Sequence, residues 1–195
     1  KLAIEAEIAE LESFLLLANS IEHNEKGEKL LVALKSGFEK LEELGANRKA
    51  LIFTESTRTQ AYLFQRLSQE EYAGRILIFN GSNNDEVSKK IYNEWVEDEK
   101  NANKRAGSRQ VDIRHALVDA FRSDDYDIMI ATEAAAEGIN LQFCSMVVNY
   151  DLPWNPQRIE QRIGRCHRYG QKFDVVVVNF LNAGNAVENR VFELL

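Results

Sequence analysis

Short apolar runs alternate with longer amphipathic stretches along this chain, and the alternation limits the folds open to it. Residues 50–53 read Ala-Leu-Ile-Phe and residues 175–178 read Val-Val-Val-Val, so every position in each run is apolar. Because successive side chains of a strand point to opposite faces, such runs are typical of strands buried on both faces in a parallel sheet. Strands that alternate with helices imply right-handed crossovers. The sequence therefore predicts an α/β fold, a three-layer sandwich around a mostly parallel sheet.

Hydrophobic periodicity gives the predicted order of the elements. Two amphipathic helices lead into the fold over residues 1–46: one over 3–20, with the apolar stripe Ile4, Ile8, Leu11 and Leu15, and one over 28–44, which stops at Gly45. The elements expected after them are strand 49–55, helix 58–67, strand 75–79, a helical stretch, strand 127–132, strand 146–150, helix 155–169, strand 175–180 and a last helix from Asn185. With 195 residues, 45% of them hydrophobic, the chain is long enough to bury a core, and we expect a single domain over 1–195.

A polar insert over residues 83–113 interrupts the alternation of strands and helices. It contains a predicted helix over 87–96 and a tip near 104–109. We expect this insert to form a decorated hairpin at one edge of the sheet. No internal repeat or low-complexity tract accompanies it, so the rest of the chain is expected to follow the regular pattern.

Charge is unevenly distributed along the chain. The formal net charge of -7 argues against a general electrostatic nucleic-acid binder, because such proteins are usually basic. Residues 158–172, however, carry five Lys or Arg against the single acid Glu160. A local basic patch on an acidic body suits contact with a phosphate backbone. No apolar run is long enough to span a bilayer, and no membrane partner is expected.

The two cysteines, Cys144 and Cys166, lie in apolar surroundings and have no paired spacing. Disulfide frameworks and zinc sites need Cys or His at short, regular intervals, which this sequence does not show. We therefore expect reduced, structural thiols and no metal site. Such cysteine usage is typical of a cytoplasmic protein.

Residues 157–171 carry the strongest chemical signal. On a helix at about 100° per residue, Ile159, Ile163 and Cys166 form a narrow apolar stripe. The flank beside the stripe carries four arginines: Arg158, Arg162, Arg165 and Arg168. Arginine fits phosphate bidentately and stays charged at physiological pH, so this flank predicts an anion site; ordinary solvated surface is the alternative. Gly164 costs about 1 kcal/mol relative to Ala inside a helix, so it needs a reason in packing or in access.

Polar residues follow four of the predicted strands. They occupy residues 54–58, 80–82, 132–133 and 151–155. Because the carboxyl ends of parallel strands meet at the same edge of a sheet, these segments are expected to lie near one another. Ligands of open α/β sheets bind at that edge, so the functional site is expected there.

Four sequence blocks resemble the second RecA-like domain of superfamily-two helicases and translocases, specifically the Swi/Snf-type ATPases. Motif IV of that family resembles residues 50–58, and motif V resembles residues 131–141. The Gly-Ser block and its following helix resemble Gly81-Ser82 with Arg114, Leu117 and Phe121. The Trp-Asn-Pro element and motif VI resemble residues 151–157, which run into a helix over 155–170. The resemblance covers roughly residues 29–181 and implies a RecA-like sandwich. The insert is a departure, because the family places that arginine only a few residues after the Gly-Ser pair.

Two further departures bring the chain closer to one branch of this family. Glu133 stands where eukaryotic remodellers usually carry Arg, and Gly164 stands where they carry Asp. Bacterial members resemble the chain more closely at these positions, among them an ATPase that associates with RNA polymerase. The resemblance therefore implies a bacterial translocase rather than a chromatin remodeller.

The resemblance also implies a set of residues around ATP. Arg165 and Arg168 would be arginine fingers that reach across an interdomain cleft to the γ-phosphate, where such a finger raises the rate by about 10³ to 10⁵. The remaining residues near the nucleotide would be Gln161, Glu137, Gly138 and Asn140. On its own, a glycine just past a strand end indicates close approach to a ligand or a positive φ; an ordinary turn glycine is the alternative reading of Gly138.

A second implied set would hold the sugar-phosphate backbone of the tracked strand. It comprises Ser56, Thr57, Arg58, Gly81, Ser82 and Thr132, with Trp154 near the duplex. Hydroxyls and backbone N–H groups contact phosphates without reading sequence, as a translocase requires. Helix capping is the alternative for Ser56 or Thr57. A turn with a buried aromatic is the alternative for Trp154.

Parts of an ATPase are missing from the sequence. It has no G-x-x-x-x-G-K-[ST] loop to cradle phosphates, and no DExH-like box follows an apolar strand. Because the chain opens at Lys1, we expect it to be a piece of a longer protein whose N-terminal RecA-like domain supplies these parts. ATP and Mg²⁺ would act in the full-length protein, with Mg²⁺ held by that other domain. We expect this polypeptide alone to be inactive.

The leading hypothesis is the C-terminal motor domain of a bacterial, cytoplasmic ATP-dependent translocase that tracks double-stranded DNA. One alternative is a non-catalytic RecA-like module that docks a protein such as RNA polymerase through the lead-in helices or the insert. Another is an unrelated nucleotide-binding α/β protein, such as a sugar-nucleotide transferase. That class normally grips phosphate with a glycine-rich loop after the first strand, where this chain reads Thr54-Glu55-Ser56.

Overall fold

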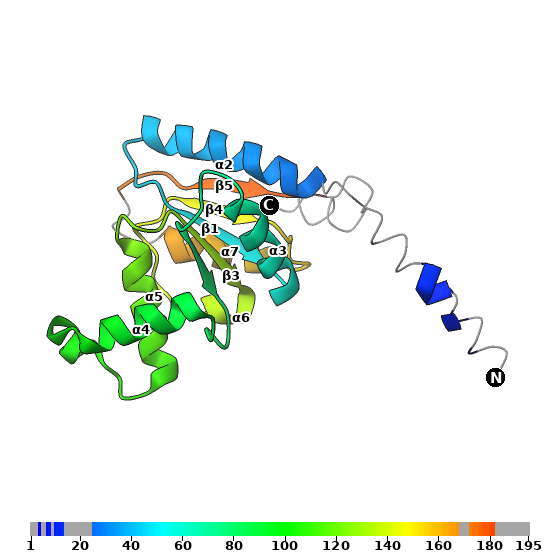
Figure 1. Ribbon diagram of the computed structural model, residues 1–195. Helices are drawn as coiled ribbons and strands as arrows, with labels where there is room; N and C mark the ends of the chain where they lie inside the picture. Colours follow the sequence, from blue (N-terminus) through cyan, green and yellow to red (C-terminus); the bar gives the residue numbers. More distant parts are fainter. Residues whose placement is uncertain (1–3, 5–6, 9, 14–24, 168–171, 182–195) are drawn as a thin grey trace.

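The fold is built on one parallel sheet. The structure, a computed structural model, describes residues 4, 7–8, 10–13, 25–167 and 172–181 (Figure 1). The strands are β1 (Ala50–Thr54), β2 (Ile76–Phe79), β3 (Ile128–Thr132), β4 (Met146–Asn149) and β5 (Val176–Asn179), in the spatial order β2-β3-β1-β4-β5. Each neighbouring pair is parallel. The predicted α/β class is confirmed, and the sheet is parallel throughout the described residues.

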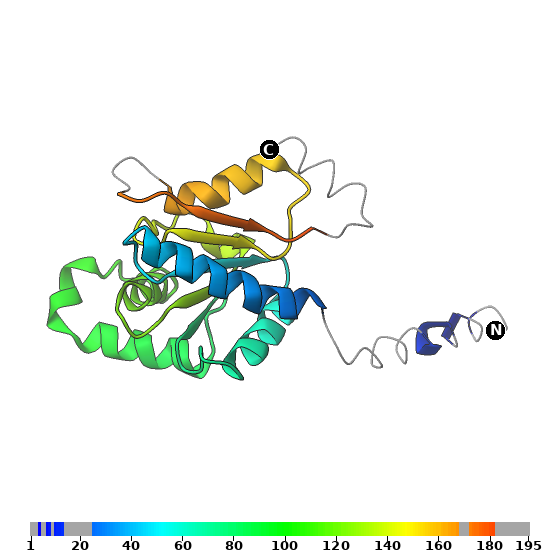
Figure 2. The same ribbon diagram turned by 90° about the horizontal axis from the view of Figure 1, so that it is seen from above.

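Helices cover both faces of the sheet, which gives the three predicted layers. On one face lie α2 (Glu25–Glu43) and α3 (Thr57–Ser68); Figure 2 shows α2 over the sheet in the view from above. On the other face lie α5 (Arg109–Arg122), the short α6 (Glu133–Ala136) and α7 (Pro156–Cys166). Figure 1 shows the sheet between α2 and these three helices.

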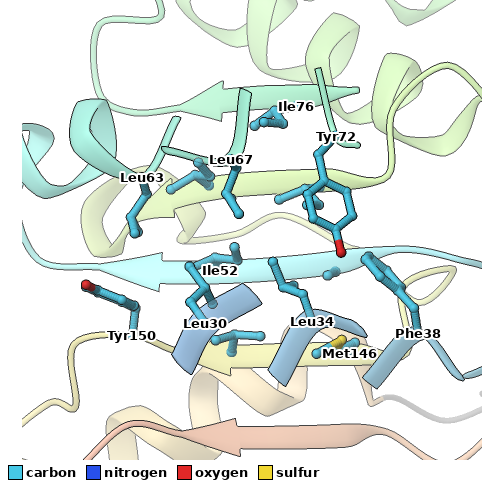
Figure 3. Packing of buried hydrophobic residues seen from close by; sticks show 14 of the residues in the cluster. Leu30, Leu34, Phe38, Ile52, Leu63, Leu67, Tyr72, Ile76, Met146 and Tyr150 are labelled. Atoms are coloured by element: carbon cyan, nitrogen blue, oxygen red, sulfur yellow. The ribbon is translucent and has the colours of Figure 1, made fainter. Parts of the chain in front are cut away.

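Two apolar clusters hold the layers together, one on each face of the sheet. Ile52, Ile130 and Val148 point into the first cluster, whereas Phe53, Met129 and Val147, each a neighbour in sequence, point into the second. Figure 3 shows the first cluster, in which side chains of α2 and α3 meet the strands. This alternation is the reason why the strand sequences are apolar at every position.

Helix α2 is a full layer of this sandwich. Leu34 and Leu41 are completely buried, and Gly37 lies so close to β4 that an added Cβ would be 2.3 Å from the Met146 methyl carbon. The helix ends as predicted: Gly45 has φ +67°, and the Ala46 N–H donates to the Leu41 carbonyl at 2.9 Å.

The stripe predicted for the first helix is only partly described. Residues 4, 7–8 and 10–13 are helical, as expected. Ile4, Ile8 and Leu11 of the stripe are 62%, 49% and 62% exposed. Leu15 and the remainder of 14–24 lie outside the described residues, as does the helix predicted from Asn185.

The insert is helical. Helix α4 (Glu86–Glu97) confirms the helix predicted over 87–96, and a 3-10 turn, η1 (Glu99–Lys104), follows it. Helix α4 packs along α5 and lies beside the edge strand β2. Trp95 is buried between the two helices, and its indole N–H donates to Asp119 at 3.0 Å. The insert is thus a helical pair at one sheet edge, and residues 109–113 already belong to α5.

The helix that carries the arginines begins where the sequence predicts. Asn155 caps α7 by accepting a hydrogen bond from the Gln157 N–H at 2.9 Å, and Pro156 occupies the first turn. Helix α7 ends at Cys166, and residues 168–171 lie outside the described part of the chain. Within the described residues, no helix has both the length and the apolar character needed to cross a membrane.

Candidate functional site

The carboxyl ends of the strands bring the predicted segments together at one edge of the sheet. Thr54 at the end of β1 is paired with Thr132 at the end of β3, and Phe53 is paired with Asn149 at the end of β4. The segments after these strands therefore start side by side. This edge is where the sequence places the functional site.

Arg162 lies at the centre of this edge, and its side chain is only 2% exposed. Its Nε donates to the Glu133 carboxylate at 2.7 Å, and its Nη2 donates to the same oxygen. Its Nη1 donates to the Asn149 side chain at 3.0 Å and to the Asp151 carbonyl at 2.8 Å. The guanidinium carbon also lies 4.8 Å from the centre of the Phe53 ring. Arg162 thus joins α7 to the ends of three strands.

The family resemblance assigns no ATP contact to Arg162, and its burial shows that this member of the arginine flank does not face outward. Arg162 is three residues after Ile159 and four before Cys166, both of which are buried, so it lies on the inward face of α7. The helical spacing alone carried this signal, but the charge of the residue obscured it. Arg158, by contrast, is exposed.

Asp151 is a second polar centre beneath the site. Its Oδ2 accepts hydrogen bonds from the Thr54 hydroxyl at 2.6 Å and the Glu55 N–H at 3.0 Å, and its Oδ1 accepts one from Lys26 at 3.2 Å. Burial by itself raises the pKa of Asp151, but the hydrogen bonds from Thr54 and Glu55 and the charge of Lys26 outweigh burial and lower it. The carboxylate therefore stays ionised and ties α2 to the end of β1.

Arg165 differs from Arg162 although it lies only three residues later. Its backbone carbonyl accepts a hydrogen bond from the Leu141 N–H at 2.9 Å, which fixes α7 to the segment after α6. Its side chain is half-buried, and no group among the described residues forms a hydrogen bond or ion pair with it. Gln161 is exposed one turn earlier on the same helix. Arg168 lies outside the described residues.

Glu137, Gly138 and Asn140 share one cavity of about 520 Å³, with Arg114, His115 and Arg122 of α5 on its other side. Gly138 has φ +77°, a left-handed conformation that suits glycine and confirms one of the two properties inferred for this position. Gln161 and Arg165 are not among the residues that line this cavity. The structure thus brings three of the predicted ATP residues together and leaves Gln161 and Arg165 on the neighbouring helix.

The turn after β1 presents three predicted residues to solvent. Ser56, Thr57 and Arg58 are all exposed. Ser56 is the N-cap of α3, since its hydroxyl accepts a hydrogen bond from the Thr59 N–H at 3.0 Å. The capping alternative therefore holds for Ser56, whereas Thr57 and Arg58 form the exposed first turn of the helix.

The loop after β2 holds Gly81 and Ser82 in a fixed turn. The Asn80 side-chain oxygen accepts from the Ser82 N–H at 3.0 Å, the Ser82 hydroxyl at 2.9 Å and the Asn83 N–H at 2.9 Å. The Asn83 Oδ1 in turn accepts a hydrogen bond from the Asn80 N–H at 2.8 Å, and Asn83 has φ +45°. A small cavity of about 210 Å³ adjoins this loop, with Arg109 at the start of α5 among its lining residues.

Asn80, Asn83 and the buried Gln60 of α3 hold the loop after β2 in place, and the motif comparison did not single them out. Gln60 is buried and donates to the carbonyls of Phe79 and Ile130 at 3.2 and 2.7 Å, while its oxygen accepts from Asn80 at 3.0 Å. Asparagine tolerates the left-handed region and forms side-chain turns, so the Asn80-Gly81-Ser82-Asn83 spacing was an available signal.

Thr132 directly precedes Glu133 in the chain, and Trp154 follows Asp151 by three residues. Thr132 is 8% exposed and stands at the N-cap position of α6 without a side-chain capping bond. Trp154 is 74% exposed, so the alternative of a buried aromatic in a turn is wrong. An exposed indole at a ligand-binding edge is suited to stacking.

Three other expectations have structural outcomes. Cys144 and Cys166 are free and buried side by side, and the hydrogen bond with the Cys144 thiol, together with burial, raises the pKa of Cys166.

An added Cβ at Gly164 would meet no atom within 4 Å, so the packing reason proposed for this glycine is wrong. Among the described residues, no cluster of His, Cys, Asp and Glu could hold a metal ion.

Comparison with known proteins gives a family match. A family model described as "Helicase conserved C-terminal domain" matches residues 60–170. The chain is 39% identical over 147 residues to "Uncharacterized ATP-dependent helicase YqhH" of Bacillus subtilis (strain 168), covering 75% of this chain and 21% of the relative. It is 31% identical over 134 residues to the ATP-dependent RNA helicase RhlB of Hamiltonella defensa subsp. Acyrthosiphon pisum (strain 5AT), covering 69% and 31%.

A shorter match adds a third relative. Over 81 residues the chain is 42% identical to the RNA polymerase-associated protein RapA of Serratia proteamaculans (strain 568), which covers 40% of this chain and 8% of that protein. The chain therefore spans less than a third of the length of each of these three relatives.

Solved structures match the fold. The C-terminal part of the Fun30 ATPase domain superposes with a TM-score of 0.57 at 22% identity, covering 89% of this chain and 46% of that one. The E. coli DEAD-box protein SrmB, solved bound to RraA, gives a TM-score of 0.55 at 18% identity, covering 88% and 79%. At these identities the likeness concerns the fold alone.

Proposed function

Since this chain belongs to the family of helicase conserved C-terminal domains, we propose that it is the C-terminal RecA-like motor domain of a nucleic-acid-dependent ATPase. Its role would be to contact the nucleic-acid backbone and to complete an ATP site whose other half lies in an N-terminal RecA-like domain of the same polypeptide. The relatives named as ATP-dependent helicases, of which the matched segments cover 21% and 31%, support this division of labour.

One observation carries the proposal: the half-buried Arg165 side chain of α7 has no hydrogen-bond or ion-pair partner among the described residues, while its backbone is fixed to the segment before β4. The neighbouring Arg162 is buried and fully bonded, whereas Arg165 has no side-chain partner among the described residues. Phosphoryl transfer depends on positioned positive charge more than on covalent chemistry. Arg165 on a helix fixed at both Arg162 and Leu141 would meet that need as an arginine finger, with Arg168 as the second finger.

The same half-site would position the nucleotide. Gln161, Glu137, Gly138 and Asn140 are the proposed nucleotide contacts, and Gly138 is open enough for a ligand to approach the backbone. The described residues contain no group of three or more His, Cys, Asp or Glu that could hold a metal ion by themselves. We assign Mg²⁺ to the N-terminal domain, where it would neutralise charge on the phosphates.

Double-stranded DNA is the proposed nucleic acid. The exposed Trp154, the hydroxyls of Ser56, Thr57, Ser82 and Thr132, and the Arg58 guanidinium would contact its backbone, with Gly81 allowing close approach. The Trp-Asn-Pro and motif VI residues support a Swi/Snf-type translocase. RNA polymerase is the proposed protein partner because RapA is named as associated with it, and such a partner would place the protein in the bacterial cytoplasm.

The test compares two proteins: this chain alone, and the chain together with its N-terminal RecA-like domain, here called the two-domain protein. Steady-state ATP hydrolysis is measured without nucleic acid, with duplex DNA and with single-stranded RNA. We expect duplex DNA to stimulate the two-domain protein roughly tenfold or more, and the chain alone to show no turnover.

Each result of this comparison has a defined reading. Stimulation by RNA but not by duplex DNA would contradict duplex DNA as the nucleic acid but agree with a motor domain. ATP hydrolysis by the chain alone would overturn the proposed function. So would a two-domain protein whose ATP hydrolysis neither nucleic acid stimulates.

A further inference from the structure

Arg162 and Glu133 form a buried ion pair for which fold stability is not a sufficient reason. A buried guanidinium pays a large desolvation cost, and replacing such a pair by apolar residues is often neutral or stabilising. The pair nevertheless lies at the carboxyl edge, where Arg162 is 2% exposed and Glu133 26% exposed. Arg162 donates both of its hydrogen bonds with Glu133 to a single carboxylate oxygen, Oε2. The other oxygen, Oε1, accepts no hydrogen bond from the described residues.

The partners of Arg162 adjoin the proposed nucleic-acid contacts. Glu133 directly follows Thr132 in the chain. Asp151, whose carbonyl binds Arg162 at 2.8 Å, holds the Thr54 hydroxyl and the Glu55 N–H with its carboxylate. Ser56 comes next after Glu55. Two of the three loops proposed to hold phosphates, those at Ser56 and Thr132, are thus one residue away from groups bonded within this network.

On its other side the pair controls the position of α7. Arg165 lies less than one helical turn after Arg162, and its carbonyl is bonded to the Leu141 N–H at 2.9 Å. The helix is therefore held at the sheet by Arg162 and at the 137–141 segment by Arg165. A phosphate arriving at Thr132 would bring negative charge beside Glu133, repel its carboxylate and move the guanidinium bonded to it.

We infer that Glu133 and Arg162 are a positioning pair that makes ATP hydrolysis depend on bound nucleic acid. This inference rests on the proposed function and deepens it. Neither residue contacts ATP or nucleic acid in this scheme. The pair acts through α7, which carries Arg165 to its working position only when the nucleic-acid loops are occupied.

The experiment uses the two-domain protein and the substitution Glu133→Gln, which removes the charge and keeps the shape. Glu160→Gln is the matched control, because Glu160 is an exposed carboxylate on α7, the helix that carries Arg162. With saturating duplex DNA, we expect Glu133→Gln to lower kcat roughly tenfold, while the KM for ATP and the DNA concentration for half-maximal stimulation stay within about twofold. Glu160→Gln is expected to match wild type in all three.

A purely structural role predicts a different pattern. In that case Glu133→Gln would lower the midpoint of thermal unfolding and leave kcat of the folded protein within twofold of wild type, and this result would overturn the inference. If Glu133→Gln does not fold, Glu133→Asp is measured in its place, because it keeps the carboxylate charge but shortens the side chain that binds Arg162. A fall in kcat of about threefold with unchanged KM would support the pair, and an unchanged kcat would overturn it.

Failure of the proposed function looks different again. A wild-type two-domain protein that shows no nucleic-acid stimulation would refute that function, and the positioning pair with it. A stimulated wild type beside an equally stimulated Glu133→Gln variant would refute the pair alone.

Discussion

Two arginines three positions apart on α7 have opposite surroundings, and this contrast determines how the site is interpreted. Arg162 is bonded to Glu133, Asn149 and the Asp151 carbonyl, so its charge is neutralised inside the protein. Arg165 has no side-chain hydrogen bond or ion pair among the described residues, and we propose that it contacts the phosphate of ATP. A fan of arginines on a helix is therefore not one functional unit, and burial separates the structural member from the candidate finger.

Asp151 gives a prediction about pH. Its pKa is lowered below the ordinary 3.8, so it stabilises the fold at higher pH, and that contribution is lost as pH falls below 3.8 toward the folded-state pKa. We expect Asp151→Asn to be less stable than wild type at pH 7 and to lose less free energy of unfolding between pH 7 and pH 3. Urea unfolding at the two pH values measures this. Asp124→Asn, at an exposed carboxylate, should lose as much as wild type, and an equal loss in Asp151→Asn would contradict the assignment.

At the scale of elements, α2 is the main departure from the expected organisation. The sequence indicates a helix that leads into the domain, but the structure makes this helix the outer layer on one face of the sheet. Lys26 at its start also reaches Asp151 below the candidate site. Helix α2 should therefore contribute to stability as a core element does.

Two substitutions in α2 test this. Leu34 is completely buried, so Leu34→Ala should lower the free energy of unfolding by about 3 kcal/mol through lost burial and the cavity that remains. Val32 is 67% exposed on the same helix, so Val32→Ala should change it by less than about 0.5 kcal/mol. Denaturant unfolding of the two variants gives both values. Equal effects would show that α2 is not packed as described.

The strands could be predicted closely because each is a continuous apolar run. The predicted 127–132 and 175–180 compare with β3 at 128–132 and β5 at 176–179. The spatial order β2-β3-β1-β4-β5 could not be read from the chain, because it depends on which crossovers pack best. The local sequence pattern determines where a strand begins and ends, whereas the packing of the whole core determines which strands pair with it.

Properties of the site that depend on the local backbone could be predicted from the sequence. The exposure of a side chain could not, because it depends on how the helices pack on the sheet. The positive φ of Gly138 was predicted, although the glycine lies two residues after the short helix α6 and not directly after β3. The burial of Arg162 and the exposure of Trp154 depend on how α7 lies on the sheet, and charge or hydrophobicity alone suggests the reverse for each. These two residues show why motif membership does not fix a side chain's surroundings.

At the scale of the whole molecule, the carboxyl edge collects the loops that follow β1, β3 and β4, together with α7, over a buried polar network. The described part of this edge contains cationic and amide groups but no cluster fit for a metal ion. We propose that it supplies one half of a phosphoryl-transfer site, a role that the match to the helicase C-terminal domain family supports. The remaining half would come from the N-terminal domain.

The central claim is that Arg165 completes the ATP site, and single-turnover hydrolysis of bound ATP by the two-domain protein with duplex DNA tests it most directly. Arg165→Ala is compared with Arg158→Ala, which removes an exposed arginine from the same helix. We predict a fall of roughly 10³-fold in the rate for Arg165→Ala, with DNA binding retained, and a rate within about twofold of wild type for Arg158→Ala. A rate for Arg165→Ala within about threefold of wild type would contradict the claim.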